Sequence, residues 1–161
     1  MAMKKSNLMI VGIDPGKNGG IAVIRCGEEA KIIVRKMPGT PQDINEFFKT
    51  LCNLSGGHLI TVIEKLHGMP HMSGTSMFKL GCNYGYLKMA LIANNIRFFE
   101  IPPQRWQKHY NLGTKSISGS TTAWKNKLKE KAQQLYPRMK ITLWASDAVL
   151  IAEYARLTKI K

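Results

Sequence analysis

Three acidic residues of this chain lie at the edge of short apolar segments. Asp14 and Glu64 each end an apolar run, and Asp147 opens the apolar run 148–152. A carboxylate is costly to place beside an apolar element unless something pairs with it. The chain has only 10 Asp and Glu against 24 Lys and Arg. Three such placements favour one shared cationic partner, namely a divalent metal ion with nucleic acid behind it.

Each acid also has an individual explanation. Asp14 suits a turn, because a Pro-Gly pair follows it. Glu64 suits an ion pair with Lys65 at a strand end. Asp147 suits the first turn of a helix, where the helix dipole favours acids. The combination favours a common site, since clustered carboxylates coexist comfortably only when protons or cations intervene.

The chemistry of such a site follows from its ligands. Mg²⁺ prefers a few carboxylates, several waters and phosphate oxygens to a complete protein cage. Two such ions about 4 Å apart activate an attacking water and stabilise the leaving oxygen of a phosphodiester. We expect Asp14 to bridge the ions, with Glu64 and Asp147 on either side.

The secondary-structure elements must bring these acids together. Fully apolar runs indicate strands covered on both faces. Apolar residues at helical spacing, with proline in the first turn, indicate helices. We expect strands over 8–14, 21–26, 30–36, 59–64 and 96–101, and helices over 41–54, 76–94, 104–110, 122–136 and 144–156.

This order predicts an α/β fold with a mixed five-stranded sheet, in one domain over residues 1–161. The first three strands are expected to be antiparallel neighbours. The fourth and fifth alternate with helices and are expected to be parallel additions. Asp14 and Glu64 then emerge at one edge of the sheet, and Asp147, near the start of the last helix, closes the site.

The bulk composition indicates the class of partner. The formal net charge of +14 favours polyanions, through phosphate contacts and counterion release. The three cysteines are widely spaced and form no Cys-x-x-Cys pair, so we interpret them as reduced thiols. No apolar stretch approaches the roughly 20 residues that span a bilayer, and no membrane partner is expected. We expect an intracellular, DNA-containing compartment: the cytoplasm of a bacterial or phage-infected cell, or an organelle.

Several segments, in order along nearly the whole chain, resemble a known family. The first is Gly-Ile-Asp-Pro-Gly at 12–16, with Gly-Gly-Ile-Ala at 19–22. The others are 62–64, 76–81, 101–108 and 147–154. The ordered set resembles the RuvC-type Holliday-junction resolvases of the RNase H-like superfamily, in particular their bacteriophage-type branch.

The resemblance implies an RNase H-like fold and a homodimer formed through the helix between Gly81 and Leu91. It implies a crossover junction endodeoxyribonuclease that cuts four-way DNA junctions and leaves 5′-phosphate and 3′-hydroxyl ends. It also implies Mg²⁺ or Mn²⁺, two ions per subunit, with Asp14, Glu64 and Asp147 as the catalytic metal ligands.

The chain departs from the family at one ligand position. The family usually carries a fourth ligand, Asp or His, three or so residues before the last Asp, and this chain has Trp144 there. The second ion then depends on another group, such as Glu153, His67 or water. The departure also leaves open a protein that binds junctions and cuts poorly.

Other residues are candidates for DNA contact. His67 stands where cellular members of the family carry an aromatic wedge; it either stacks on a base or faces solvent. Lys115 lies in a Gly/Ser-rich loop that suits a backbone contact. Lys125 belongs to the charge run 125–131, which is equally typical of a solvated helix face. The predicted DNA-binding residues are His67, Arg105, Lys108, Lys115 and Lys125.

Aromatic residues are interleaved with these basic ones. Trp106, Tyr110 and Trp124 either pack internally or stack on bases. For the two tryptophans we favour packing in the core, because buried aromatic residues are common.

Two other functions stay open at this point. A junction-binding protein with little catalysis is motivated by Trp144. An RNase H proper shares the fold and cuts RNA in RNA/DNA hybrids.

Overall fold

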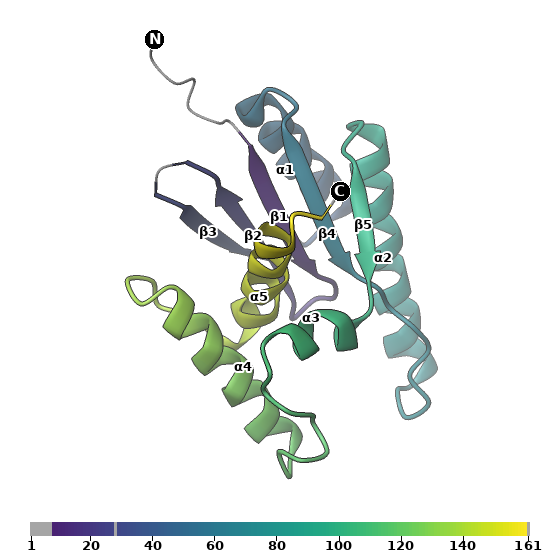
Figure 1. Cartoon of the computed structure of the whole chain (residues 1–161). Helices are drawn as coiled ribbons and strands as arrows, with labels where there is room; N and C mark the ends of the chain where they lie inside the picture. Colours follow the sequence, from purple (N-terminus) through teal and green to yellow (C-terminus); the bar gives the residue numbers. More distant parts are fainter. Residues whose placement is uncertain (1–7, 28, 161) are drawn as a thin grey trace.

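The computed structural model describes residues 8–27 and 29–160, which form a mixed sheet with helices on both faces (Figure 1). The strands are β1 (Met9–Asp14), β2 (Gly20–Arg25), β3 (Lys31–Lys36), β4 (Leu59–Glu64) and β5 (Phe98–Ile101). The helices are α1 (Pro41–Ser55), α2 (Gly74–Ala93), α3 (Pro103–His109), α4 (Thr121–Leu135) and α5 (Leu143–Thr158). Every expected element is present, with ends that differ by at most two residues.

The strand order across the sheet is β3-β2-β1-β4-β5. β1, β2 and β3 pair antiparallel, whereas β4 joins β1 and β5 joins β4 in parallel. This confirms the predicted mixed sheet. It also puts the carboxyl ends of β1, β4 and β5 at the same edge.

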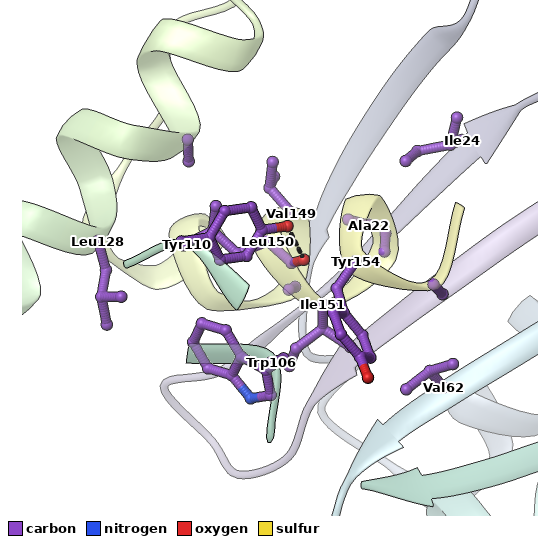
Figure 2. Close-up of a cluster of buried hydrophobic side chains, with 14 of the residues drawn as sticks. Ala22, Ile24, Val62, Trp106, Tyr110, Leu128, Val149, Leu150, Ile151 and Tyr154 are labelled. Carbon is purple, nitrogen blue, oxygen red and sulfur yellow. Dashed lines mark hydrogen bonds between the residues drawn. The ribbon is translucent and has the colours of Figure 1, made fainter. Parts of the chain in front are cut away.

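The helices divide the core into two layers. α5 lies across one face of the sheet, with α3 and α4 beyond it, while α1 and α2 lie behind the other face (Figure 1). Both tryptophans predicted to pack belong to the first layer: Trp106 is fully buried and Trp124 nearly so. Figure 2 shows the same layer, where the Tyr110 hydroxyl donates a hydrogen bond of 2.6 Å to the Leu150 carbonyl and so ties the end of α3 to α5.

One glycine sets the distance between α5 and the sheet. A Cβ atom on Gly12, in the middle of β1, would lie 2.4 Å from the carbonyl oxygen of Ala148 and 2.4 Å from the amide nitrogen of Ala152. These are backbone atoms of α5 and cannot rotate away. The helix therefore packs directly on the β1 backbone, with alanine as its contact residue on both turns.

The turn after β1 is fixed from the opposite face. Gly16 has a φ of +109°, which L side chains rarely adopt. Its amide donates a hydrogen bond of 2.7 Å to the side chain of Asn83 on α2. The segment that follows Asp14 is thereby held between the two helical layers.

Cys26, Cys52 and Cys82 are all free. Over the described ranges, no helix is long and apolar enough to cross a bilayer.

Gly12→Ala tests the close contact between β1 and α5. Because the added methyl group meets backbone on two sides, we expect the free energy of unfolding to fall by about 3 kcal/mol, the upper end of overpacking costs. Urea denaturation followed by circular dichroism measures this change. Gly39→Ala is the control: a Cβ added at this glycine would meet nothing within 4 Å, so its change is expected to stay within about 0.5 kcal/mol. Equal stability of the two variants would contradict the contact.

Candidate active site

Two of the predicted acids end neighbouring parallel strands. Asp14 is the last residue of β1 and Glu64 the last residue of β4. The ladder pairs Ile13 with Ile63, so the next residue on each strand is one of the two acids. Both side chains therefore leave the sheet at its carboxyl edge, as the sequence predicted.

Asp147 comes to this edge on α5. The helix begins at Leu143, so Asp147 lies in its second turn, and the first turn contains no acid. The alternative that Asp147 is a first-turn acid stabilised by the helix dipole is therefore wrong. Its position follows from packing, because the next residue, Ala148, is the one that contacts Gly12 on β1.

The charges of the three acids act on one another. The pKa of Asp14 lies well above its ordinary value, first because the carboxyl is buried and then because Asp147 and Glu64 carry charge of the same sign. The ammonium of Lys125 opposes this increase. The charges of both other acids therefore act on Asp14.

The pKa values of Glu64 and Asp147 are raised as well. Burial, together with the charge of Asp147, raises the pKa of Glu64 from 4.5 to about 7, against the effect of a hydrogen bond from Trp106. Burial also raises the pKa of Asp147, while a hydrogen bond from Ser146 and the charge of Lys125 oppose the increase. All three carboxylates are therefore costly to ionise together without a cation.

The ion pairs of the protein lie elsewhere. Among the described residues, Lys and Arg pair with Glu46, Glu100 and Glu153 and with none of the three site acids. The alternative ion pair between Glu64 and Lys65 is absent from this set and is therefore wrong. In the same part of the chain, no three His, Cys, Asp or Glu side chains already form a group that would hold a metal ion. The acids are coupled, but they do not stand in a finished coordination geometry.

Glu64 is held by a buried indole. Nε1–H of Trp106 donates a hydrogen bond of 2.8 Å to Oε2 of Glu64, across 42 residues of sequence. The Trp106 side chain is fully buried, and Figure 2 shows it between α5 and the end of β4. We predicted from the sequence that this ring packs in the core, but the hydrogen bond to Glu64 was not predicted. The available signal was that a buried indole N–H usually finds an acceptor.

Trp144 occupies the position where the resembling family carries a fourth ligand. Its ring packs against Gly20 at the start of β2: a Cβ there would lie 3.0 Å from a ring carbon. The Lys36 ammonium lies 5.9 Å from the ring centroid. At the position where the resembling family has Asp or His, this chain therefore has an apolar ring with a lysine ammonium near it.

Glu153 does not replace the missing ligand. Its Oε1 accepts a hydrogen bond of 2.6 Å from Arg156, and its Oε2 accepts bonds of 2.8 Å from Arg156 and from the Tyr136 hydroxyl. The side chain is buried with these partners. Of the three alternatives for the missing ligand, Glu153 is wrong, because both of its carboxylate oxygens already accept hydrogen bonds.

Of the predicted DNA-binding residues, one acts electrostatically on the site acids and another is fixed by a hydrogen bond. Lys125 is exposed on α4, and its positive charge opposes the increase in the pKa values of both Asp14 and Asp147. Arg105 on α3 is exposed and oriented by a hydrogen bond of 3.0 Å from its Nε to the Tyr154 hydroxyl. His67, Lys108 and Lys115 are exposed as well, and their contacts with DNA stay predictions.

Comparisons with known proteins bear on the fold. No family model and no curated protein matches the sequence. Thermus thermophilus RuvC in complex with a Holliday junction substrate matches with a TM-score of 0.66 and 15% identity, over 94% of each chain. The chain has the RuvC fold. Another T. thermophilus RuvC structure gives a TM-score of 0.61 and 14% identity, over 94% of this chain and 97% of that one. Yeast mitochondrial Holliday junction resolvase Ydc2 gives 0.51 and 14%, over 95% and 79%.

The RuvC fold gives the three acids a common location. They come from β1, β4 and α5, elements far apart in sequence that meet at the carboxyl edge of the sheet. The donors are all carboxylate oxygens, which are the ligands that Mg²⁺ and Mn²⁺ accept. The residues present therefore fit a hard divalent cation, although three carboxylates are few for two ions.

Trp106→Phe tests how Glu64 is held. The variant keeps most of the buried ring and loses the indole N–H, so the pKa of Glu64 is expected to rise further and its carboxylate to lose its fixed orientation. Affinity for Mn²⁺ near neutral pH should fall about 10- to 100-fold, the usual cost of losing a group that orients a metal ligand. Titration of the protein with Mn²⁺, followed by electron paramagnetic resonance, measures this affinity.

Trp124→Phe is the matched control. Trp124 lies in the same apolar layer, and among the described residues its indole makes no hydrogen bond to a carboxylate. This variant should bind Mn²⁺ as the wild type does, with thermal unfolding as the check on folding. A similar loss of affinity in both variants would show that Trp106 acts only through packing.

Proposed function

We propose that this protein is a metal-dependent endonuclease that resolves four-way DNA junctions. The single observation that carries the proposal is the coupling of Asp14, Glu64 and Asp147, three acids that lack ion pairs within the described residues. Their place at the edge of a RuvC fold supports the same activity, since the similar structures are a RuvC bound to a Holliday junction and a mitochondrial junction resolvase.

Each of the residues at the site would have a separate role in cleavage. Bound Mg²⁺ or Mn²⁺ would activate a water and stabilise the leaving oxygen, giving 5′-phosphate and 3′-hydroxyl ends. Asp14 would bridge, because it is coupled to both other acids. Trp106 would keep Glu64 in one orientation. Lys125, beside the acids, would attract the scissile phosphate.

The number of ions depends on ligand supply. We propose two per subunit, held by Asp14, Glu64 and Asp147. Because Trp144 offers no oxygen and Glu153 is bound to Arg156 and Tyr136, waters and phosphate oxygens of the DNA would complete the coordination of the second ion. That ion would then bind mainly in the presence of DNA.

The basic surface would position the junction. With a net charge of +14, the protein attracts phosphate from any duplex, and this attraction falls with salt. Arg105, Lys108 and Lys115 would contact the backbone near α3 and the loop that follows it. His67, exposed after β4, would lie against the open centre of the junction. Such a protein would act in an intracellular, DNA-containing compartment.

A homodimer would pair two such sites. The outer face of α2 carries exposed apolar residues, with Phe78 73%, Met89 59% and Ile92 54% exposed. Cys82 and Gly85 complete a stripe with alternating spacings of four and three residues, and a Cβ on Gly85 would meet nothing within 4 Å. This is the spacing of a helix–helix seam. A two-fold dimer through α2 would suit a two-fold junction that needs paired cuts.

One observation favours a second function. Trp144 leaves three carboxylates where the resembling family has four ligands. A protein with this site would bind junctions and cleave them weakly or not at all. Incubation of the wild-type protein with a labelled junction and Mg²⁺ or Mn²⁺ separates the two functions: binding without nicking would favour the binding protein.

Asp14→Asn tests the site acids. The amide keeps the shape of the side chain and removes the charge, so we expect junction binding to be retained and Mg²⁺-dependent nicking to fall by more than about 100-fold, beyond the cost of losing a merely supporting group. A gel-shift titration and a nicking assay on the same labelled junction measure the two. Glu130→Gln, the same change at an exposed acid on α4, is the control and should cut at the wild-type rate. Wild-type cutting by Asp14→Asn would refute the assignment.

Met89→Glu tests the dimer. A charge in the middle of the α2 stripe should convert the dimer to a monomer, because a buried unpaired carboxylate is costly at an interface. Light scattering after size exclusion measures the mass. Leu157→Glu, at a residue 48% exposed on α5, is the control and should stay dimeric. A monomeric wild-type protein would overturn the interface.

A further inference from the structure

Within the described residues, the edge strand β3 presents a row of backbone groups that pair with no other strand. Met37 N–H donates to the Gly19 carbonyl at 3.2 Å, which continues the β2–β3 ladder. Hydrogen-bonded and non-bonded pairs alternate in an antiparallel ladder. The N–H and C=O groups of Ile33 and Arg35 therefore face β2, whereas those of Ile32, Val34 and Lys36 face the open edge of the described sheet. Such an edge can accept a further strand.

A groove of about 1040 Å³ lies along this edge. α1 borders the groove on one side, and the residues of this helix that line it are Phe47, Thr50, Leu51 and Leu54. Met9, Val23 and Leu51 form an apolar floor. Ile33 on β3 is 64% exposed and Leu54 on α1 is 59% exposed, and both line the groove. The edge therefore combines free backbone groups with apolar surface for side chains.

The charged residues of the groove are mostly basic. The guanidinium of Arg35 lies 5.8 Å from the ring centroid of Phe47, which holds it at the groove wall. Of the acids in the lining, Glu153 is already bound by Arg156, and Glu29 lies in the turn before β3. The basic residues left to meet a ligand are Arg25, Lys31, Arg35 and Arg138.

We propose that this groove binds an extended acidic segment of a partner protein, which adds to the sheet as a strand beside β3. Its backbone would pair with Ile32, Val34 and Lys36, its apolar side chains would cover Ile33 and Leu54, and its acids would meet the basic rim. Strand addition of this kind takes affinity from backbone hydrogen bonds and specificity from alternate side chains.

The charge of the edge distinguishes this occupant from others. A second copy of the chain would bring Lys31 and Arg35 against the same residues, and like charges on adjacent strands are destabilising. Nucleic acid would meet the basic rim but would leave the apolar floor uncovered. An acidic strand satisfies both features. The groove uses none of Asp14, Glu64 and Asp147, so the proposal stands or fails separately from the nuclease.

A designed peptide tests the proposal. The probe is a peptide of repeated Val-Ser-Glu-Ser, which puts Val and Glu on the same face of the added strand, and it is long enough to span the six residues of β3. We expect saturable binding to the full-length protein, with the largest amide shifts in nuclear magnetic resonance at Ile32, Val34 and Lys36. Ile33→Glu should weaken binding about tenfold or more. Ile117→Glu is the control, at an isoleucine that is 76% exposed in the loop between α3 and α4, and it should bind the peptide as the wild type does. Both variants should keep the wild-type circular dichroism spectrum.

Three results would overturn the proposal. The first is the absence of saturable binding, and the second is equal affinity for a peptide of repeated Val-Ser-Lys-Ser. The third is displacement of the peptide by a plain DNA duplex that shifts the same β3 amides, which would make the edge a nucleic-acid surface. Junction binding that stays unchanged in Ile33→Glu would show that the two surfaces are independent.

Discussion

The direct contact between β1 and α5 is the constraint on which the candidate site depends. Gly12 has no side chain, so the backbone of α5 at Ala148 and Ala152 lies against the strand. Asp14 is two residues further along β1, and Asp147 is one residue before Ala148. A larger residue at position 12 would lift the helix and separate these two acids. The same small residues therefore account for the close packing of α5 on β1 and for the short separation of the two acids along these elements. α3 and α4 pack in turn against α5.

The site that results is electrostatically unfavourable in the absence of a cation. Burial and like charge raise the pKa values of Asp14, Glu64 and Asp147 together. The structure moderates this cost in two ways: the Trp106 indole hydrogen-bonds Glu64, and the Lys125 ammonium lies near the two aspartates. Neither contact neutralises the cluster. Carboxylates that a fold brings together and leaves unpaired are a typical arrangement for metal-assisted chemistry.

The sheet also separates three surfaces with different properties. The carboxyl edge of β1 and β4 carries the acids, with basic residues of α3 and α4 around them. The outer face of α2 carries an apolar stripe with little charge. The edge at β3, two strands from β1, combines free backbone groups with an apolar floor and a basic rim. A mixed sheet keeps the three surfaces apart, because the carboxyl ends of its strands, the helices that cover its faces and its outermost strand point in different directions.

The sequence by itself determined the local features. Apolar runs and turn residues located the strands, and their order predicted that Asp14 and Glu64 share one edge, because hydrophobic periodicity and chain connectivity are readable residue by residue. Contacts between distant segments were decided only by the tertiary structure: the hydrogen bond from Trp106 to Glu64, the packing of Ala148 on Gly12 that brings Asp147 to the sheet edge, and the hydrogen bond from Tyr136 to Glu153. These depend on how closely α5 approaches β1 and on which side chains then meet, and no local pattern encodes that distance.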